Sequence, residues 1–130
     1  MKKILTLFLV TVFCLGLAGC SKDAEFNAFT TEFETVTNEM SAKLETGDVD
    51  GAQKIFDAKK DSLKTKWAGI KDARGVQVSK ETQTKFEESM KKNGATLQSA
   101  IMKGSMKNPN PASAQKMQAL MKEYLAIIQV

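Results

Sequence analysis

The sequence is short of several residues on which protein chemistry often depends. Its 130 residues include no histidine, two cysteines, two prolines, one tryptophan and one tyrosine. The lack of histidine removes the most common general base and metal ligand at neutral pH. Cys14 lies in an apolar segment near the start and Cys20 directly follows it, so the rest of the chain has no thiol nucleophile and no disulfide. We therefore expect a protein that is not an enzyme and that holds no cofactor.

The only long uncharged run lies at the amino-terminal end. Lys2 and Lys3 precede fifteen residues, Ile4 to Ala18, that carry no charge. A basic start, a short apolar stretch and then small residues are typical of a secretory signal peptide. Fifteen helical residues span about 22 Å, which is less than the roughly 30 Å hydrocarbon core of a bilayer. The segment therefore indicates export rather than a permanent membrane span.

The end of this segment, Leu17-Ala18-Gly19-Cys20, resembles the lipobox of bacterial lipoproteins. The resemblance implies cleavage between Gly19 and Cys20, a diacylglycerol on the Cys20 sulfur and an acyl chain such as palmitate on the new amino group. Two or three acyl chains hold a protein stably at a membrane, whereas one binds only marginally. Ser21 follows, and in the Gram-negative sorting pattern that this resembles a serine here favours the outer membrane. The expected location is the cell envelope, facing the periplasm or exposed at the surface.

The charges are divided unevenly along the chain. Residues 20–50 carry eight acids and two lysines, whereas residues 51–130 carry fifteen bases and seven acids. One explanation is an acidic first helix that packs beside basic neighbours. The other is a basic strip for anionic lipid headgroups or polyanions, formed by Lys59, Lys60, Lys64, Lys66, Lys71 and Arg74. An exported chain with one tryptophan and one tyrosine is not expected to bind nucleic acid.

Apolar residues recur at helical spacing after the signal peptide, and no segment has the alternation of a strand. Residues 1–19 are predicted to be the signal peptide and residues 20–130 a single domain, with helices at about 23–45, 49–74, 79–103 and 111–128. Gly47 is expected to end the first helix, while Asp48, Ser79 and Asn110 cap the next three and Pro111 opens the last. The short connections predict an all-α fold, an antiparallel up-down-up-down four-helix bundle after a cleaved signal peptide.

Two glycines near the third helix have different expected roles. Gly94 lies on the same apolar stripe as Met90 and Leu97, so we expect it to let a neighbouring helix approach closely. Gly104 begins the stretch "GSMKNPN", which ends at Asn110 and reads as a loop. The third helix is therefore predicted to continue through Gly94 and to end before Gly104.

Methionine is the residue with the most open interpretation. Met102 and Met106 are four residues apart, as are Met117 and Met121. Thioethers at that spacing can share a soft ion such as Cu(I). Methionine also fills irregular cores, and Met117 and Met121 lie on the predicted apolar face.

These features favour a membrane-anchored envelope lipoprotein that acts as a non-catalytic interaction or binding module. Its partner would be another envelope protein or an anionic surface. One alternative is a carrier that holds a small ligand or a metal ion such as Cu(I) in the bundle core, and another is a purely structural envelope lipoprotein. An exposed apolar or basic patch would favour the interaction module, whereas a cavity or methionine cluster in the core would favour the carrier.

Overall fold

The computed structural model describes residues 21–73 and 75–129. Within these residues there are four α-helices, one short 3-10 helix and no strand, so the prediction of an all-helical domain is confirmed for this part of the chain. The elements are α2 (Asp23–Glu45), α3 (Val49–Ile70), η1 (Gly75–Gln77), α4 (Lys80–Lys107) and α5 (Pro111–Ala126). The predicted signal peptide, the cleavage site at Gly19 and Cys20, and Arg74 lie outside the described residues. No helix in the described ranges combines the length and the apolar character needed to cross a bilayer.

Local sequence sets most helix boundaries, as predicted. Gly47 has a φ of +82°, the left-handed conformation that ends α2 without a clash of a Cβ atom. Pro111 occupies the first turn of α5. Each of the next three helices starts at a side-chain oxygen that accepts a backbone N–H: Asp48 from Gly51 at 2.9 Å, Ser79 from Thr82 at 3.2 Å, and Asn110 from Ala112 at 2.9 Å. These bonds satisfy amide groups that the first turn of a helix leaves unpaired.

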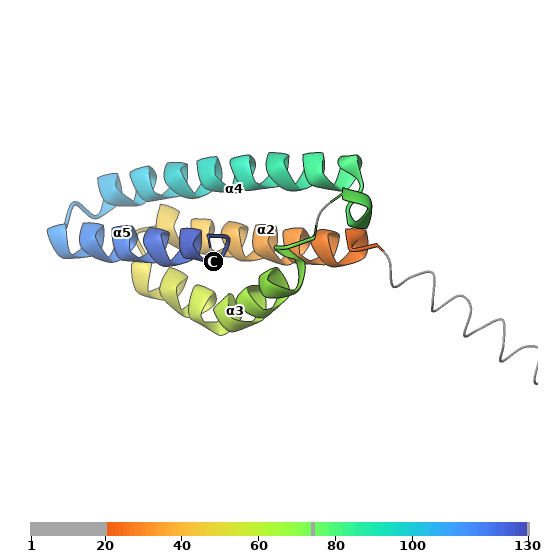
Figure 1. Cartoon of the computed structure of the whole chain (residues 1–130). Coiled ribbons are helices and arrows are strands. Elements are labelled where there is room, and N and C mark those ends of the chain that lie inside the picture. Colours follow the sequence, from red (N-terminus) through yellow and green to blue (C-terminus); the bar gives the residue numbers. More distant parts are fainter. Residues whose placement is uncertain (1–20, 74, 130) are drawn as a thin grey trace, which may run out of the picture.

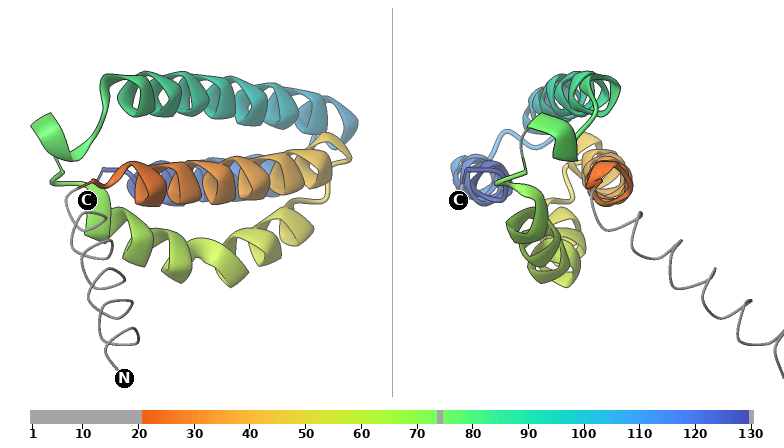
Figure 2. Two further views of the ribbon diagram at one scale, coloured as in Figure 1. Left: turned by 90° about the vertical axis from the view of Figure 1, so that its right-hand side faces the viewer. Right: turned by 45° about the vertical axis from the view of Figure 1, so that its right-hand side comes forward.

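Helix α2 makes most of the packing contacts, because it lies between α3 and α4. Viewed along the bundle, the helices follow one another around the axis as α2, α3, α5 and α4 (Figure 2). The pairs joined by short turns, α2 with α3 and α4 with α5, run antiparallel (Figure 1). Helices α2 and α4 run parallel, since Glu34 pairs with Lys92 and Glu45 pairs with Lys103. Neighbouring helices are therefore not all antiparallel, although successive helices do alternate in direction.

The parallel contact between α2 and α4 follows from how the link between α3 and α4 is held. The Lys22 N–H donates to the Gln77 carbonyl oxygen at 2.7 Å, and the Ser79 N–H donates to Asp23 Oδ1 at 2.8 Å. The second bond lowers the pKa of the Asp23 carboxyl, because the amide stabilises its charged form. Both bonds fix the start of α4 beside the start of α2. The link containing η1 therefore crosses the end of the bundle and brings α4 to the far side of α2 from α3.

The core is built around the apolar face of α2. Six apolar residues recur at helical spacing along α2 and form its central seam, and all are buried: Phe26, Phe29, Phe33, Val36, Met40 and Leu44. Tyr124 of α5 stacks on Phe33 with ring centroids 4.6 Å apart. Its hydroxyl lies 2.5 Å from Thr37 Oγ1, which itself donates to the Phe33 carbonyl oxygen. The tyrosine is therefore the donor in this bond, and burial raises the pKa of Tyr124.

Two predictions about the third helix are wrong. Helix α4 continues through Gly104 to Lys107, so the stretch that begins at Gly104 is mostly helical. A Cβ atom at Gly104 would lie 2.0 Å from the Leu44 carbonyl oxygen, whereas a Cβ atom at Gly94 would meet nothing within 4 Å. The glycine that allows close approach to α2 is therefore Gly104. Helix α3 also ends earlier than predicted, at Ile70 instead of residue 74.

Candidate functional site

Helix α5 is too short to cover the whole bundle. Its 16 residues span about 24 Å, whereas the 28 residues of α4 span about 42 Å. Because α5 starts at the end where α4 finishes, it stops before it reaches the first turns of α4. The end of the bundle that contains the start of α2 is thus packed by three helices and the η1 link.

An aromatic groove lies at this end, and we define it by the residues that line it. It has a volume of about 300 Å³ and is lined by Phe26, Trp67, Lys71, Ala73, Val78, Gln83, Phe86 and Glu87. Trp67 and Phe86 are partly exposed and stack with their centroids 5.6 Å apart and their planes 13° from parallel. Phe26 meets Phe86 edge to face at 5.6 Å. The groove therefore has an aromatic floor with polar groups at its rim.

Trp67 also borders a second depression on the side of α5. This one measures about 270 Å³ and is lined by Lys64, Trp67, Ala68, Lys71 and Ile127. The indole Nε1 is buried and has no hydrogen-bond partner among the described residues. Ser41 Oγ is the only other buried side-chain polar atom in the described ranges without a partner. Leaving a buried donor unpaired costs about 1–3 kcal/mol.

A third depression, larger than these two, has a different character. It measures about 580 Å³, lies between α2 and α3, and contains the ion pair between Glu32 and Lys66 together with exposed threonines. The hydrogen bond from Lys66 lowers the pKa of Glu32. This depression is a shallow furrow in which Glu32 and Lys66 already pair with each other, so it offers less to a ligand than the aromatic groove.

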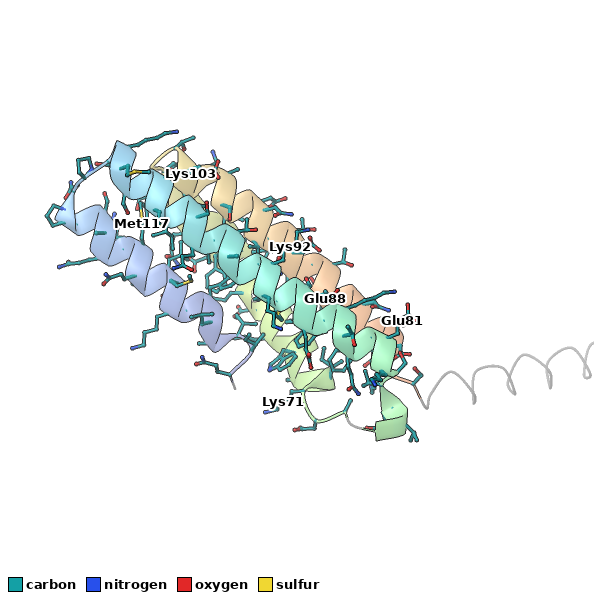
Figure 3. The ribbon with its side chains drawn as sticks, turned by 90° about the horizontal axis from the view of Figure 1, so that it is seen from above. Lys71, Glu81, Glu88, Lys92, Lys103 and Met117 are labelled. Atoms are coloured by element: carbon teal, nitrogen blue, oxygen red, sulfur yellow. The ribbon has the colours of Figure 1, made fainter. Side chains whose placement is uncertain are left out.

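The predicted basic strip is divided between the two sides of α3. Lys59 and Lys66 border the furrow toward α2, whereas Lys64 and Lys71 border the depression toward α5. Lys60 pairs with Asp57 at 3.4 Å and with Glu123 at 3.2 Å. Arg74 lies outside the described residues. The acidic α2 and its basic neighbours are instead linked directly, and Lys92 and Lys103 reach α2 from α4 (Figure 3).

The four methionines do not come together as one cluster. Met117 is buried between α5 and α4, where its Sδ lies 3.6 Å from Ser105 Oγ (Figure 3). Met102 is 62% exposed and Met106 is 74% exposed. Met102 and Met121 line one groove between α4 and α5. The two methionines that share a groove therefore come from different helices, whereas each predicted pair lies four residues apart on one helix. No group of three or more acidic residues within the described ranges is placed to hold a metal ion.

Comparison with known proteins gives no relative from which a role could be taken. No protein-family model matches the chain, and no curated protein and no solved structure matches it either. The proposal for its function therefore depends on the residues and their geometry. Trp67 and Phe86 recur at the apolar spacing of their helices, which does not by itself show that they line a groove. The available signal was the short predicted helix at 111–128, which could not cover the predicted helices at 49–74 and 79–103.

Proposed function

We propose that the protein is a bacterial envelope lipoprotein, anchored by lipid on Cys20 after cleavage of residues 1–19, and that it acts as a non-catalytic binding module. The lipobox Leu17–Cys20 supports the anchor. Helix α2 begins at Asp23, so the aromatic groove beside it would stand close to the membrane. The proposed location is the outer membrane, from Ser21, with the domain facing the periplasm or the surface.

The observation that carries the binding role is the aromatic groove, in which Trp67 and Phe86 stack and stay partly exposed. Stacked rings that remain partly exposed at the end of a bundle offer apolar contact area, and aromatic side chains are enriched at binding surfaces. The ligand chemistry that fits is a planar or apolar group that packs on the aromatic rings and turns its polar atoms toward the polar side chains of the rim. A side chain or ring of an envelope protein meets that description, and so does a small amphipathic molecule.

A photo-crosslinking experiment tests the binding role. A photoreactive amino acid replaces Gln83, which lines the groove, and in a matched variant it replaces Asn38, which is exposed on α2. After irradiation of intact membranes, we expect adducts from position 83 that are absent from position 38, with the partner identified by mass spectrometry. Equal adducts from both positions, or none from position 83, would contradict a binding role for this groove.

The anchor has a separate test. Replacing Cys20→Ser removes the only sulfur at the proposed cleavage site, because the other cysteine, Cys14, lies within the signal peptide. We expect unprocessed or soluble protein, measured by membrane fractionation and intact mass. A variant that fractionates with membranes at the same processed mass as the natural chain would show that the lipobox interpretation is wrong.

A second candidate is the carrier of a soft metal ion, because Met102 and Met121 line the same groove. Two thioethers alone make a weak site for Cu(I), since the third and fourth ligands would have to come from another molecule. Titration with Cu(I) under reducing conditions distinguishes this candidate: a stoichiometric complex lost in Met121→Leu would favour it over the aromatic groove. The third candidate, a purely structural lipoprotein, predicts neither crosslinks nor metal binding.

A further inference from the structure

Ion pairs join the helices along three of the four sides of the bundle. They link α2 to α3, α2 to α4 and α3 to α5, through Glu32–Lys66, Glu34–Lys92, Glu45–Lys103, Asp50–Lys116 and Lys60–Glu123. Between the described residues of α4 and α5 there is no ion pair, and these two helices make few contacts with each other. One side of the bundle is therefore built differently from the others.

This fourth side holds an uncharged groove. The groove measures about 390 Å³ and is lined by Gln98, Ile101, Met102, Gln118 and Met121; we name it the methionine–glutamine groove. Met102 is 62% exposed, and Leu125, one turn beyond Met121, is 37% exposed. Of the four large apolar side chains exposed on the described surface, three belong to α4 or α5. Exposed apolar patches on soluble domains often mark interaction surfaces.

We propose that two copies of the chain associate through the methionine–glutamine groove. In a two-fold symmetric contact the same patch occurs on both sides, so any charge in its centre tends to meet a like charge. The other three sides of the bundle carry lysines and carboxylates, whereas this groove is lined by none. A glutamine amide has both donors and an acceptor and can pair with another glutamine, and methionine adapts its shape to an irregular neighbour. The lining is thus complementary to itself.

The position of the groove is compatible with two anchors in one membrane, a point that rests on the proposed lipid anchor. The groove lies along the side of the bundle between α4 and α5, away from the end where α2 starts. A two-fold axis parallel to the helices would place α4 of one copy against α5 of the other. In that arrangement Met102 of one copy would face Met121 of the other. Confinement to a membrane raises the effective concentration of such a pair.

The test uses sedimentation of residues 21–130 from about 1 μM to about 1 mM, the range of weak association. This segment contains the whole described core, from Phe26 to Ile127. We expect a monomer–dimer equilibrium. Met102→Glu should raise the dissociation constant at least about tenfold, because it places an unpaired charge in an apolar contact on each copy. Met106→Glu is the matched control, because Met106 is 74% exposed, lies one turn further along α4 and is not part of the groove. The dissociation constant of this variant should equal that of the natural chain.

Three outcomes would overturn the proposal. The first is a monomer at every concentration, together with no energy transfer between labelled copies coupled through Cys20 to maleimide-lipid vesicles. The second is a dimer that persists unchanged in Met102→Glu, and the third is an equal loss in Met106→Glu. If the chain stays monomeric while Met102→Glu removes crosslinks to another envelope protein, the groove belongs to that protein instead. The solution assay requires neither export nor lipid, so its failure leaves the proposed function in place.

Discussion

At the scale of single residues, Tyr124 and Gly104 have structural roles that their positions in the sequence do not predict. The Tyr124 hydroxyl is buried against Thr37 in the centre of the bundle. Gly104 is buried where α4 passes the carbonyl of Leu44. Each is a place where one or a few atoms decide how two helices meet, so each gives a sharp test of the packing.

Tyr124→Phe should change stability in a pH-dependent way. At pH 7 the variant loses one buried hydrogen bond, at a cost of about 1 kcal/mol, while the ring stack on Phe33 remains. Burial raises the pKa of Tyr124, so its contribution is complete below the unfolded pKa of about 10 and decreases as the pH rises above it. The difference between the two proteins in urea unfolding should therefore shrink or reverse by about pH 11. A constant difference from pH 7 to that pH would contradict the burial of this hydroxyl.

The two glycines of α4 should respond in opposite directions to alanine. Gly104→Ala places a Cβ atom against backbone at Leu44 and should destabilise the fold by about 1–3 kcal/mol or more. Gly94→Ala meets nothing within 4 Å and should stabilise the helix by up to about 1 kcal/mol. Thermal and urea unfolding of both variants measure this. A larger loss of stability in Gly94→Ala than in Gly104→Ala would contradict the close approach of α4 to α2 at Gly104.

At the scale of elements, α2 is the acidic helix around which the basic helices pack. It carries six carboxylates and one lysine, Lys43. Hydrogen bonds from Lys66 and Lys103 lower the pKa of Glu32 and of Glu45, and the bond from Lys116 does the same for Asp50 at the start of α3. The charge asymmetry along the sequence is thus used, at least in part, to pair neighbouring helices.

Acid should weaken this pairing. Because these carboxyls have lowered pKa values in the folded state, their stabilisation is complete above the unfolded values of about 4 and is lost as the pH falls below them. Glu32→Gln should cost up to about 1 kcal/mol at pH 7 and close to nothing at about pH 2. Chemical unfolding at both pH values, with Glu25→Gln as a control for the exposed pair of Lys22 and Glu25 at the start of α2, measures the difference. An equal cost at both values would show that the pair with Lys66 is not what Glu32 contributes.

At the scale of the whole molecule, the surface has an aromatic end, three sides on which ion pairs join the helices and one side on which none does among the described residues. The net charge of +4 includes Lys2 and Lys3, which the proposed cleavage removes. The lysines of α3 are divided between two sides and several have carboxylate partners. A bundle of this kind has no large field of one sign to hold it at a membrane, so the lipid anchor would have to supply the attachment.

The lipid-free domain should therefore bind anionic vesicles weakly. Residues 21–130 should sediment with phosphatidylglycerol vesicles only at low salt and should be released at about 0.15 M salt, where charges are screened over about 8 Å. Vesicles of phosphatidylcholine serve as the uncharged control. Binding that persists at about 0.5 M salt would exclude an electrostatic origin and would point to insertion of apolar side chains.

The sequence by itself determined the helices, their caps and the central seam of α2. These depend on local rules: the period of 3.6 residues, the side-chain oxygens of Asp48, Ser79 and Asn110, and the left-handed freedom of Gly47. The proposed location depends on the sequence alone, through the resemblance of Leu17–Cys20 to a lipobox. Each of these features depends on residues within one or two helical turns of one another, so each can be recognised from neighbouring positions in the sequence.

Only the tertiary structure decided which helices are neighbours and which faces stay open. The choice of α4 as a parallel neighbour of α2 depends on bonds between residues far apart in the chain, such as Ser79 with Asp23. The role of Gly104 in place of Gly94 follows from that choice, since the close approach occurs where α4 passes the end of α2. The aromatic groove and the methionine–glutamine groove exist because α5 is short and contacts α4 lightly. Periodicity shows that a side chain is apolar and on a face, but whether another helix covers it is set by the geometry of the whole bundle.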